Sequence, residues 1–371
     1  ECSPWALANI VWACGKFAHA EAPLLDACLA RLTASSELSP QACSNAMYAA
    51  APLWDSDYRI SEVQAQQLVA ALVQRREEAD PQHPANTLWA AATMGLQVPL
   101  QQAHALVAAL VQKREEAKPQ ALANTLWAAA TMGLHVPQQQ AHALVAALVQ
   151  KREEADPQAL ANTLWAAATM GLEVPRQQVQ ALVAALMQER GEANPQNLAN
   201  TLWAVATMEQ ALEAGIWQLL LRTIVRKAPQ AKPQHLSNVM WAAAKRKEDF
   251  VSARREQLAG AEAALLQLAV AITSEQVAAM KQQAVSNSLW ALSELGLRPP
   301  QLTKRLGQAA HRLAPAMEPQ HVSNTALALA KLGCGDGRLF AALVNAAGGS
   351  VERFSPQDVC NLCWAVAVAD Q

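Results

Sequence analysis

The sequence predicts an all-α protein, an α-solenoid of about ten 38-residue helix-turn-helix repeats that form a superhelix. The first observation is a nearly identical segment, ANTLWAAATMGL, that begins at Ala85, Ala123 and Ala161. The second is an asparagine at the same place in every unit: Asn9, Asn45, Asn86, Asn124, Asn162, Asn200, Asn238, Asn287, Asn324 and Asn361. Units of this length stack because none can bury its apolar face alone. We expect a right-handed array with the first helix of each pair on the inner surface.

The repeats run through the whole chain of 371 residues, so we expect one continuous domain rather than several. The asparagine spacing predicts repeats near 3–38, 39–79, 80–117, 118–155, 156–193, 194–231, 232–280, 281–317 and 318–354, with a partial repeat at 355–371. The seventh repeat is longer than the others because it contains an insertion between Lys245 and Glu275.

The repeat at 118–155 illustrates the predicted elements. Pro119 suits the first position of a helix, and Gly133 suits its carboxyl-terminal end. Pro137 then opens a second helix, which carries Leu144 and Leu148 at helical spacing. In other units the N-cap position is held by Asp80, Asp156 and Asn194. No segment has the alternating pattern of a strand, so each repeat is read as two antiparallel helices.

The first helix of the repeat has an apolar arc and an uncharged arc. Leu122 and Leu126 lie on the apolar arc, and Trp127 at its edge is predicted to be inter-helix core rather than a stacking platform. The opposite arc holds small or hydrogen-bonding residues: Ala121, Asn124, Thr125 and Ala128. We expect this second arc to be exposed, because it suits a flat ligand that lies close to the backbone.

One position on the uncharged arc varies while its neighbours change little. Three residues before the asparagine the chain has, among others, His83, Ala121, Ala159, Asn197, His235 and His321. Such variation is typical of recognition of one base per unit, although drift of an exposed surface would give the same pattern. A second variable position, seven residues after the asparagine, includes Lys16, Thr131, Lys245, Glu294 and Lys331.

The net charge of −2 gives no argument for nucleic-acid binding by itself. Charge is uneven, however, because the segment from Arg222 to Arg255 holds nine basic residues and two acidic ones. Lys245, Arg246 and Lys247 within it are either phosphate contacts or a solvated loop.

Several functional classes are not supported. The seven cysteines are odd in number and irregularly spaced, which argues against a secreted disulfide framework. Cys360 and Cys363 form a single C-x-x-C, which we expect to be two buried small residues rather than a zinc or redox site. The chain has no recognisable catalytic motif and no uninterrupted apolar stretch of membrane-spanning length. We therefore expect no enzyme activity, no cofactor, no metal and no membrane span.

The motif P-Q-x-L-A-N-x-L-W-A, at Pro119–Ala128 and Pro157–Ala166, is similar to that of the octotricopeptide repeat family, and the resemblance covers essentially the whole chain. The family's second signature, Pro-Pro-Pro-Glu-Trp at the start of the second helix, is reduced here to Val136-Pro137-Gln138. The resemblance implies an RNA-binding α-solenoid of mitochondria or chloroplasts. It implies a role in the stability, processing or translation of organelle transcripts, or in organising rRNA within a mitochondrial ribosome.

We therefore predict sequence-selective binding of single-stranded RNA or an rRNA segment, with ribosomal or other organellar proteins as further partners. The predicted RNA-binding residues are His83, Asn86, Thr87, Ala121, Asn124, Thr125, Ala159, Asn162, Thr163, Asn197, Asn200, Thr201, His235, Asn238, Lys245, Arg246, Lys247, His321, Asn324 and Lys331. The alternative is a protein-binding scaffold without direct RNA contact, which the near-neutral charge favours.

Overall fold

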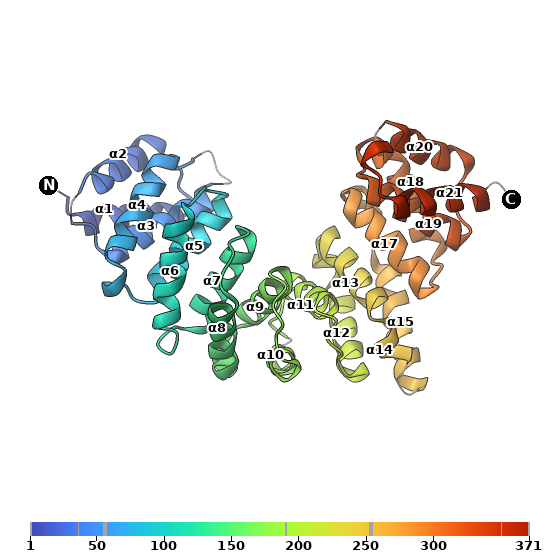
Figure 1. Cartoon of the computed structure of the whole chain (residues 1–371), viewed down its shortest axis with the longest axis horizontal. Helices are drawn as coiled ribbons and strands as arrows, with labels where there is room; N and C mark the ends of the chain where they lie inside the picture. Colours follow the sequence, from blue (N-terminus) through green and yellow to red (C-terminus); the bar gives the residue numbers. More distant parts are fainter. Residues whose placement is uncertain are drawn as a thin grey trace. The chain divides into compact units, whose positions relative to one another are not determined.

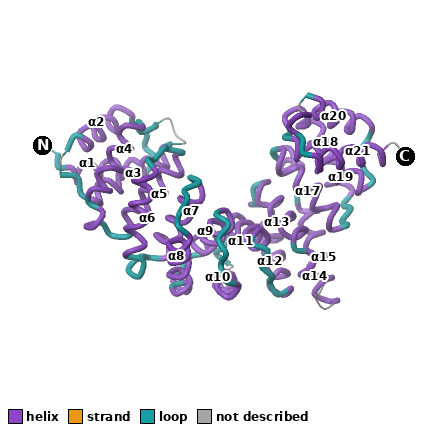
Figure 2. The backbone as a smooth tube through the Cα atoms, viewed as in Figure 1, coloured by secondary structure: helices purple, strands orange, loops and turns teal. Residues whose placement is uncertain are grey.

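The computed structural model describes residues 2–35, 37–54, 58–189, 191–251, 255–349 and 351–369, and this part of the chain contains helices and no strand (Figure 2). The α-solenoid prediction is confirmed, because first and second helices alternate along the sequence. Two compact units follow one another, residues Glu1–Glu189 and Arg190–Gln371. Among the described residues, no helix has the length and apolar character needed to cross a membrane.

The first unit is made of helix pairs in two layers (Figure 1). Its first helices are α1 (Pro4–Lys16), α3 (Pro40–Leu53), α5 (Gln82–Met94), α7 (Pro119–Thr131) and α9 (Pro157–Thr169). Its second helices are α2 (Ala22–Thr33), α4 (Glu62–Gln74), α6 (Leu100–Gln112), α8 (Gln138–Gln150) and α10 (Arg176–Gln188). Each first helix packs against the first helices of the neighbouring repeats and against the second helix of its own repeat.

The second unit has the same two layers and includes the insertion. Its first helices are α11 (Pro195–Thr207), α13 (Pro233–Lys245), α17 (Gln282–Leu295), α19 (Pro319–Leu332) and α21 (Pro356–Ala369). Its second helices are α12 (Ala214–Lys227), α15 (Arg255–Ala271), α18 (Pro300–Leu313) and α20 (Gly337–Gly348). The insertion adds two short helices, α14 (Lys247–Val251) before α15 and α16 (Ser274–Ala278) after it.

The residues predicted to begin, cap and end the helices do so, with the exception of Asp80. Helix α7 begins at Pro119, and Gly133 lies just after its end with a φ of 62°, a left-handed conformation that glycine adopts without strain. Asp156 is an N-cap as predicted, since its Oδ1 accepts a hydrogen bond of 2.7 Å from the Ala159 N–H. Asp80 is not an N-cap. Helix α5 begins two residues later, and the Asp80 N–H donates instead to Nδ1 of His83 at 3.2 Å.

Long side chains at the ends of second helices connect successive repeats. The ammonium group of Lys113 donates to the carbonyls of Glu77 and Ala79, both at 2.8 Å. Lys151 repeats this one unit later, donating to the carbonyls of Glu115 at 2.6 Å and Ala117 at 2.8 Å. These carbonyls lie in the connections that follow α4 (Glu62–Gln74) and α6 (Leu100–Gln112), so each lysine ties the end of its second helix to the connection of the preceding repeat.

We expect Lys151→Met to lower the free energy of unfolding by about 1 kcal/mol, because two carbonyls lose a charged donor at a partly solvated site. Urea unfolding followed by circular dichroism measures the change. Lys118→Met is the matched control, because Lys118 is exposed and no hydrogen bond of its side chain is seen within the described residues. Equal stability of the two variants would show that the inter-repeat bonds contribute nothing measurable.

Candidate nucleic-acid interface

In the central repeats a first helix is buried except for one narrow stripe on the surface. In α7 the residues outside the core are Gln120 and Thr131, which are exposed, and Trp127, which is partly exposed. Asn124 lies between them at the edge of the core, with 6% of its surface exposed. These four residues follow one another at intervals of four, three and four, which places them on one line along a helix. We call this line the outward stripe.

The aromatic residues of the outward stripe touch one another from repeat to repeat. Within the first unit, the ring centroids of Tyr48 and Trp89 are 5.1 Å apart. Those of Trp127 and Trp165 are 6.5 Å apart, with planes inclined by 36°. In the second unit, Trp241 and Trp290 have the same separation and inclination.

The prediction that the recurrent tryptophan is core was therefore wrong. Trp127 and Trp165 are only partly covered, and Trp12 is 42% exposed. The reason is steric, because the flanks of a first helix approach their neighbours too closely to hold an indole. The ring lies on the open side instead, partly exposed and in contact with the ring of the neighbouring repeat.

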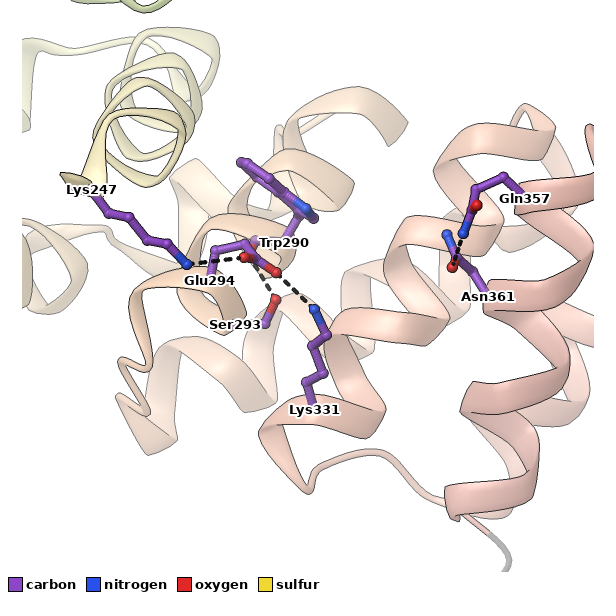
Figure 3. Close-up of polar contacts among 7 residues, drawn as sticks. All are labelled: Lys247, Trp290, Ser293, Glu294, Lys331, Gln357 and Asn361. Atoms are coloured by element: carbon purple, nitrogen blue, oxygen red, sulfur yellow. Dashed lines mark hydrogen bonds and ion pairs between the residues drawn. The ribbon is translucent and has the colours of Figure 1, made fainter. Parts of the chain in front are cut away.

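In α5, α13 and α21 the asparagine of the stripe accepts a hydrogen bond from the glutamine one turn before it. Gln82 Nε2 donates to Asn86 Oδ1 at 2.7 Å, and Gln234 Nε2 donates to Asn238 Oδ1 at 2.9 Å. The pair formed by Gln357 and Asn361 is the same, at 2.8 Å (Figure 3). Each bond uses one donor of the glutamine and one acceptor of the asparagine, and it leaves the asparagine NH₂ and the glutamine carbonyl for another partner.

The recurrent threonine and three of the alanines do not lie on the surface as predicted. Thr87, Thr125, Thr163 and Thr201 each have 0% of their surface exposed. Ala121 and Ala159 are also buried, as is Ala128. Thr125 Oγ1 donates to the Ala121 carbonyl at 3.0 Å, inside its own helix. These side chains face the flanks of the helix, where neighbouring first helices pack, and the helical periodicity of one sequence could not show which flank is covered.

The variable position three residues before the asparagine is the third residue of the helix. There it accepts a hydrogen bond from the backbone N–H that precedes the helix: Asn197 Oδ1 accepts from Asn194 at 3.0 Å, and His235 Nδ1 accepts from Lys232 at 3.3 Å. The Asn197 N–H in turn donates to Asn194 Oδ1 at 2.9 Å, and the two hydrogen bonds together form a capping box. The sequence carries a signal for this capping role, because these residues stand two positions after the proline that begins the helix.

Burial lowers the pKa of the three histidines at this position. The imidazoles of His83, His235 and His321 have pKa values below the ordinary 6.5 because burial disfavours their charged form. Lys113 adds to the effect at His83 and Lys232 adds to it at His235. All three histidines are therefore neutral in the folded chain at pH 7.

We expect the folded chain to lose stability as the pH falls below about 6.5, because the unfolded chain binds protons at these histidines more readily than the folded chain. Replacement of His83, His235 and His321 together by Asn, the residue already present at position 197, should reduce this loss. Melting temperatures at pH 7.5 and 5.5 measure it. An unchanged difference between the two pH values would mean that other groups cause the acid sensitivity.

The basic cluster predicted to meet phosphates is engaged in ion pairs. Arg246 Nη2 lies 2.7 Å from Asp249 Oδ1, and the side chains are only 18% and 8% exposed, so this pair is part of the local structure. Lys245 Nζ lies 3.6 Å from Glu209 Oε1. Of the predicted basic residues, Lys245, Lys247 and Lys331 keep exposed side chains.

Glu294 joins two of these lysines. Lys331 Nζ lies 2.8 Å from its Oε1 and Lys247 Nζ lies 3.5 Å from its Oε2 (Figure 3). The hydrogen bond from Lys331, with the charges of Lys331 and Lys247, holds the pKa of Glu294 below its ordinary value. Glu294 occupies the same position of its repeat as Lys245 and Lys331. The sequence shows this position to be variable, but the partners of the ion pairs are 47 and 37 residues apart along the chain.

Cys360 and Cys363 are both exposed, which corrects the expectation that they are buried. Among the described residues, no group of three or more His, Cys, Asp or Glu side chains is arranged to hold a metal ion.

Residues 101–190 match the family model of the Tbc2 translation factor, N-terminal domain. This stretch includes the helices from α6 to α10 in the first unit. No curated protein matches the chain. A crystal structure of an engineered protein is 15% identical over 100% of this chain and 97% of its own, with a TM-score of 0.36. A homology model of the full-length AP-3 complex in an intermediate open conformation is 10% identical over 99% and 73%, with a TM-score of 0.32. The chain therefore contains a segment similar to a translation-factor domain.

Proposed function

We propose that the outward stripes of the two units bind single-stranded RNA, and that the chain acts without catalysis as an octotricopeptide-like protein of a mitochondrion or chloroplast. Its role would be in the stability, processing or translation of organelle RNA, or in organising rRNA. The observation that supports this most strongly is the repetition of one glutamine, one asparagine and one aromatic ring on the open side of successive first helices. The similarity of residues 101–190 to a translation-factor domain also supports an RNA-related role.

The stripe offers two kinds of contact to an unpaired base. A partly exposed indole provides a face on which a base stacks, and stacking tolerates any sequence. Beside it, the asparagine NH₂ and the glutamine carbonyl form a neighbouring donor and acceptor. Every base carries an adjacent donor and acceptor on its Watson–Crick edge, so the amide pair positions a base without selecting it.

Base selection then belongs to the exposed position seven residues after the asparagine. The position three residues before the asparagine takes part in helix capping, and its alanines are buried, so its side chains stabilise the fold and are not placed to select a base. Thr93, Thr131 and Thr169 occupy the later position in three successive repeats of the first unit, and all three are exposed. Their identity implies that these three repeats prefer the same base. In the second unit Lys245 and Lys331 stand there instead.

We expect Trp127→Leu combined with Trp165→Leu to weaken binding of single-stranded RNA by roughly 10- to 100-fold, because two stacking faces are lost. Leucine is the chosen replacement because Leu327 holds the same position in the ninth repeat, so the fold tolerates it. Fluorescence anisotropy with a labelled RNA of random sequence measures the affinity.

The matched control is Thr125→Ala combined with Thr163→Ala, which changes the same helices at buried positions and should leave RNA affinity unchanged. Equal losses in the two double variants would indicate general destabilisation rather than stacking. If the parent chain does not bind RNA but binds a protein partner through the same face, the scaffold function replaces the RNA function.

We expect Glu294→Gln to raise RNA affinity and to steepen its salt dependence. The change releases Lys247 and Lys331, and each phosphate contact on a single strand adds a slope of about −0.7 in log affinity against log salt. Glu262→Gln is the control with the same charge change, because Glu262 is exposed on α15 and no ion pair of its side chain is seen among the described residues. The same effect in both variants would reduce the role of Glu294 to its contribution to net charge.

A further inference from the structure

A cavity of about 800 Å³ lies in the second unit, between α18 and the connection from α19 to α20. Figure 1 shows α18 and α20 near the carboxyl-terminal end of the chain. None of its lining residues belongs to the outward stripe, so its use is independent of RNA binding. Its volume falls within the range of pockets that hold small molecules, roughly 300–1,000 Å³.

The cavity exists because smaller residues stand here at two positions that larger side chains fill in the central repeats. Gly307 of α18 stands where α8 has the buried Val145, as shown by the match of Thr303 and Leu306 to Ala141 and Leu144. A Cβ added at Gly307 would meet only the Leu339 side chain, at an ordinary contact distance of 3.6 Å.

The second reduction is in the connection that follows the first helix. Cys334 stands where the fifth repeat has the buried Leu172, directly after a left-handed glycine in both repeats. The backbone is the same at the two places. The Leu172 N–H donates to the Ala167 carbonyl at 2.9 Å, and the Cys334 N–H donates to the Leu329 carbonyl at 3.0 Å. At this hydrogen bond the smaller Cys334 side chain therefore leaves space, while the two connections differ from the next residue on, where Gly335 has a φ of 115°.

The walls of the cavity are apolar and its rim is basic. Leu329, Leu332 and Leu339 are nearly fully buried and line its inner part. The rim residues with ionisable side chains are Arg298, Lys304, His311, Asp336 and Arg338. The one acid among them caps α20, since its Oδ1 accepts a hydrogen bond of 2.9 Å from the Leu339 N–H. Three permanent cations against one engaged carboxylate make the mouth attractive to an anion.

We propose that this cavity binds a small amphipathic anion with an aliphatic body, such as a medium-chain carboxylate. Leucine side chains cover the hydrocarbon part, and Arg298, Lys304 and Arg338 hold the anionic group at the mouth. An aliphatic body is favoured over a nucleobase because the inner lining is leucine and no Phe, Tyr or Trp lines the cavity. Its one aromatic ring, the imidazole of His311, is exposed among the charged residues of the rim.

Decanoate is the probe, titrated into the whole chain by isothermal calorimetry, with decanol and adenosine monophosphate as comparison ligands. We expect one decanoate per chain, weaker binding of decanol because it has no charge, and no competition by the nucleotide. Gly307→Val and Cys334→Leu restore the side chains of the central repeats. Each should weaken decanoate binding by at least about tenfold while the melting temperature stays the same or rises.

The charge contribution is tested at the rim. Lys304→Gln combined with Arg338→Gln should weaken decanoate binding and reduce its salt dependence, because two cations that attract the carboxylate of decanoate are removed from the mouth. Arg222→Gln is the control, an exposed arginine of α12 in the same unit. Both rim residues are exposed, so this variant keeps its fold even if a filling variant does not.

Four results would overturn the proposal: no saturable binding of decanoate, wild-type affinity in the folded filling variants, equal affinity for decanol, or unchanged affinity in the rim variant. Displacement of decanoate by adenosine monophosphate would reject the aliphatic assignment in favour of a nucleotide. Loss of RNA binding in any stripe variant has no bearing on these outcomes, so failure here and failure of the RNA function are distinguishable.

Discussion

The close approach of neighbouring first helices is the constraint on which the rest of the structure depends. Their flanks carry alanine and threonine, and in α7 every residue from Ala121 to Leu126 is buried. Small flanking residues allow helices to pack with few voids, but they leave no room for an indole or for a charged chain. What α7 presents to solvent is therefore confined to three positions of the outward stripe, Gln120, Trp127 and Thr131.

The connections between repeats set the second requirement, because their backbone carbonyls need donors. Lys113 and Lys151 supply them from the following repeat. The insertion in the seventh repeat keeps the connection with a different residue: Gln276 of α16 donates to the carbonyls of Ala228 and Ala231 at 3.0 and 2.9 Å. The longer seventh repeat, with 49 residues rather than 38 between successive asparagines, therefore keeps a side-chain donor to these connecting carbonyls although the lysine is absent.

The repeat period, the helix type and the helix ends could be predicted from the sequence, since proline, glycine and the recurrence of one motif determine them locally. The exposed side of each first helix could not. A helical wheel divides residues into two arcs, whereas Leu126, Thr125 and Trp127 face three different surroundings: the core, a neighbouring first helix and solvent. The ion pairs could not be predicted from the sequence either, because Lys247 and Glu294 are 47 residues apart and meet only after the intervening helices have packed.

The electrostatics of the stripe limit how it can hold an anionic polymer. In the first unit the positions seven residues after the asparagine are mostly threonine, and in the second unit Lys247 and Lys331 share the carboxylate of Glu294. A surface with so few unpaired cations gains little from counterion release, which dominates the affinity of most nucleic-acid-binding proteins. Under the proposed function, affinity for RNA would rest on stacking on partly exposed rings and on the amide pairs, both of which need bases that are free of partners. The same surface chemistry that makes the chain nearly neutral therefore favours unpaired RNA over a duplex, whose bases present neither a free face nor a free Watson–Crick edge.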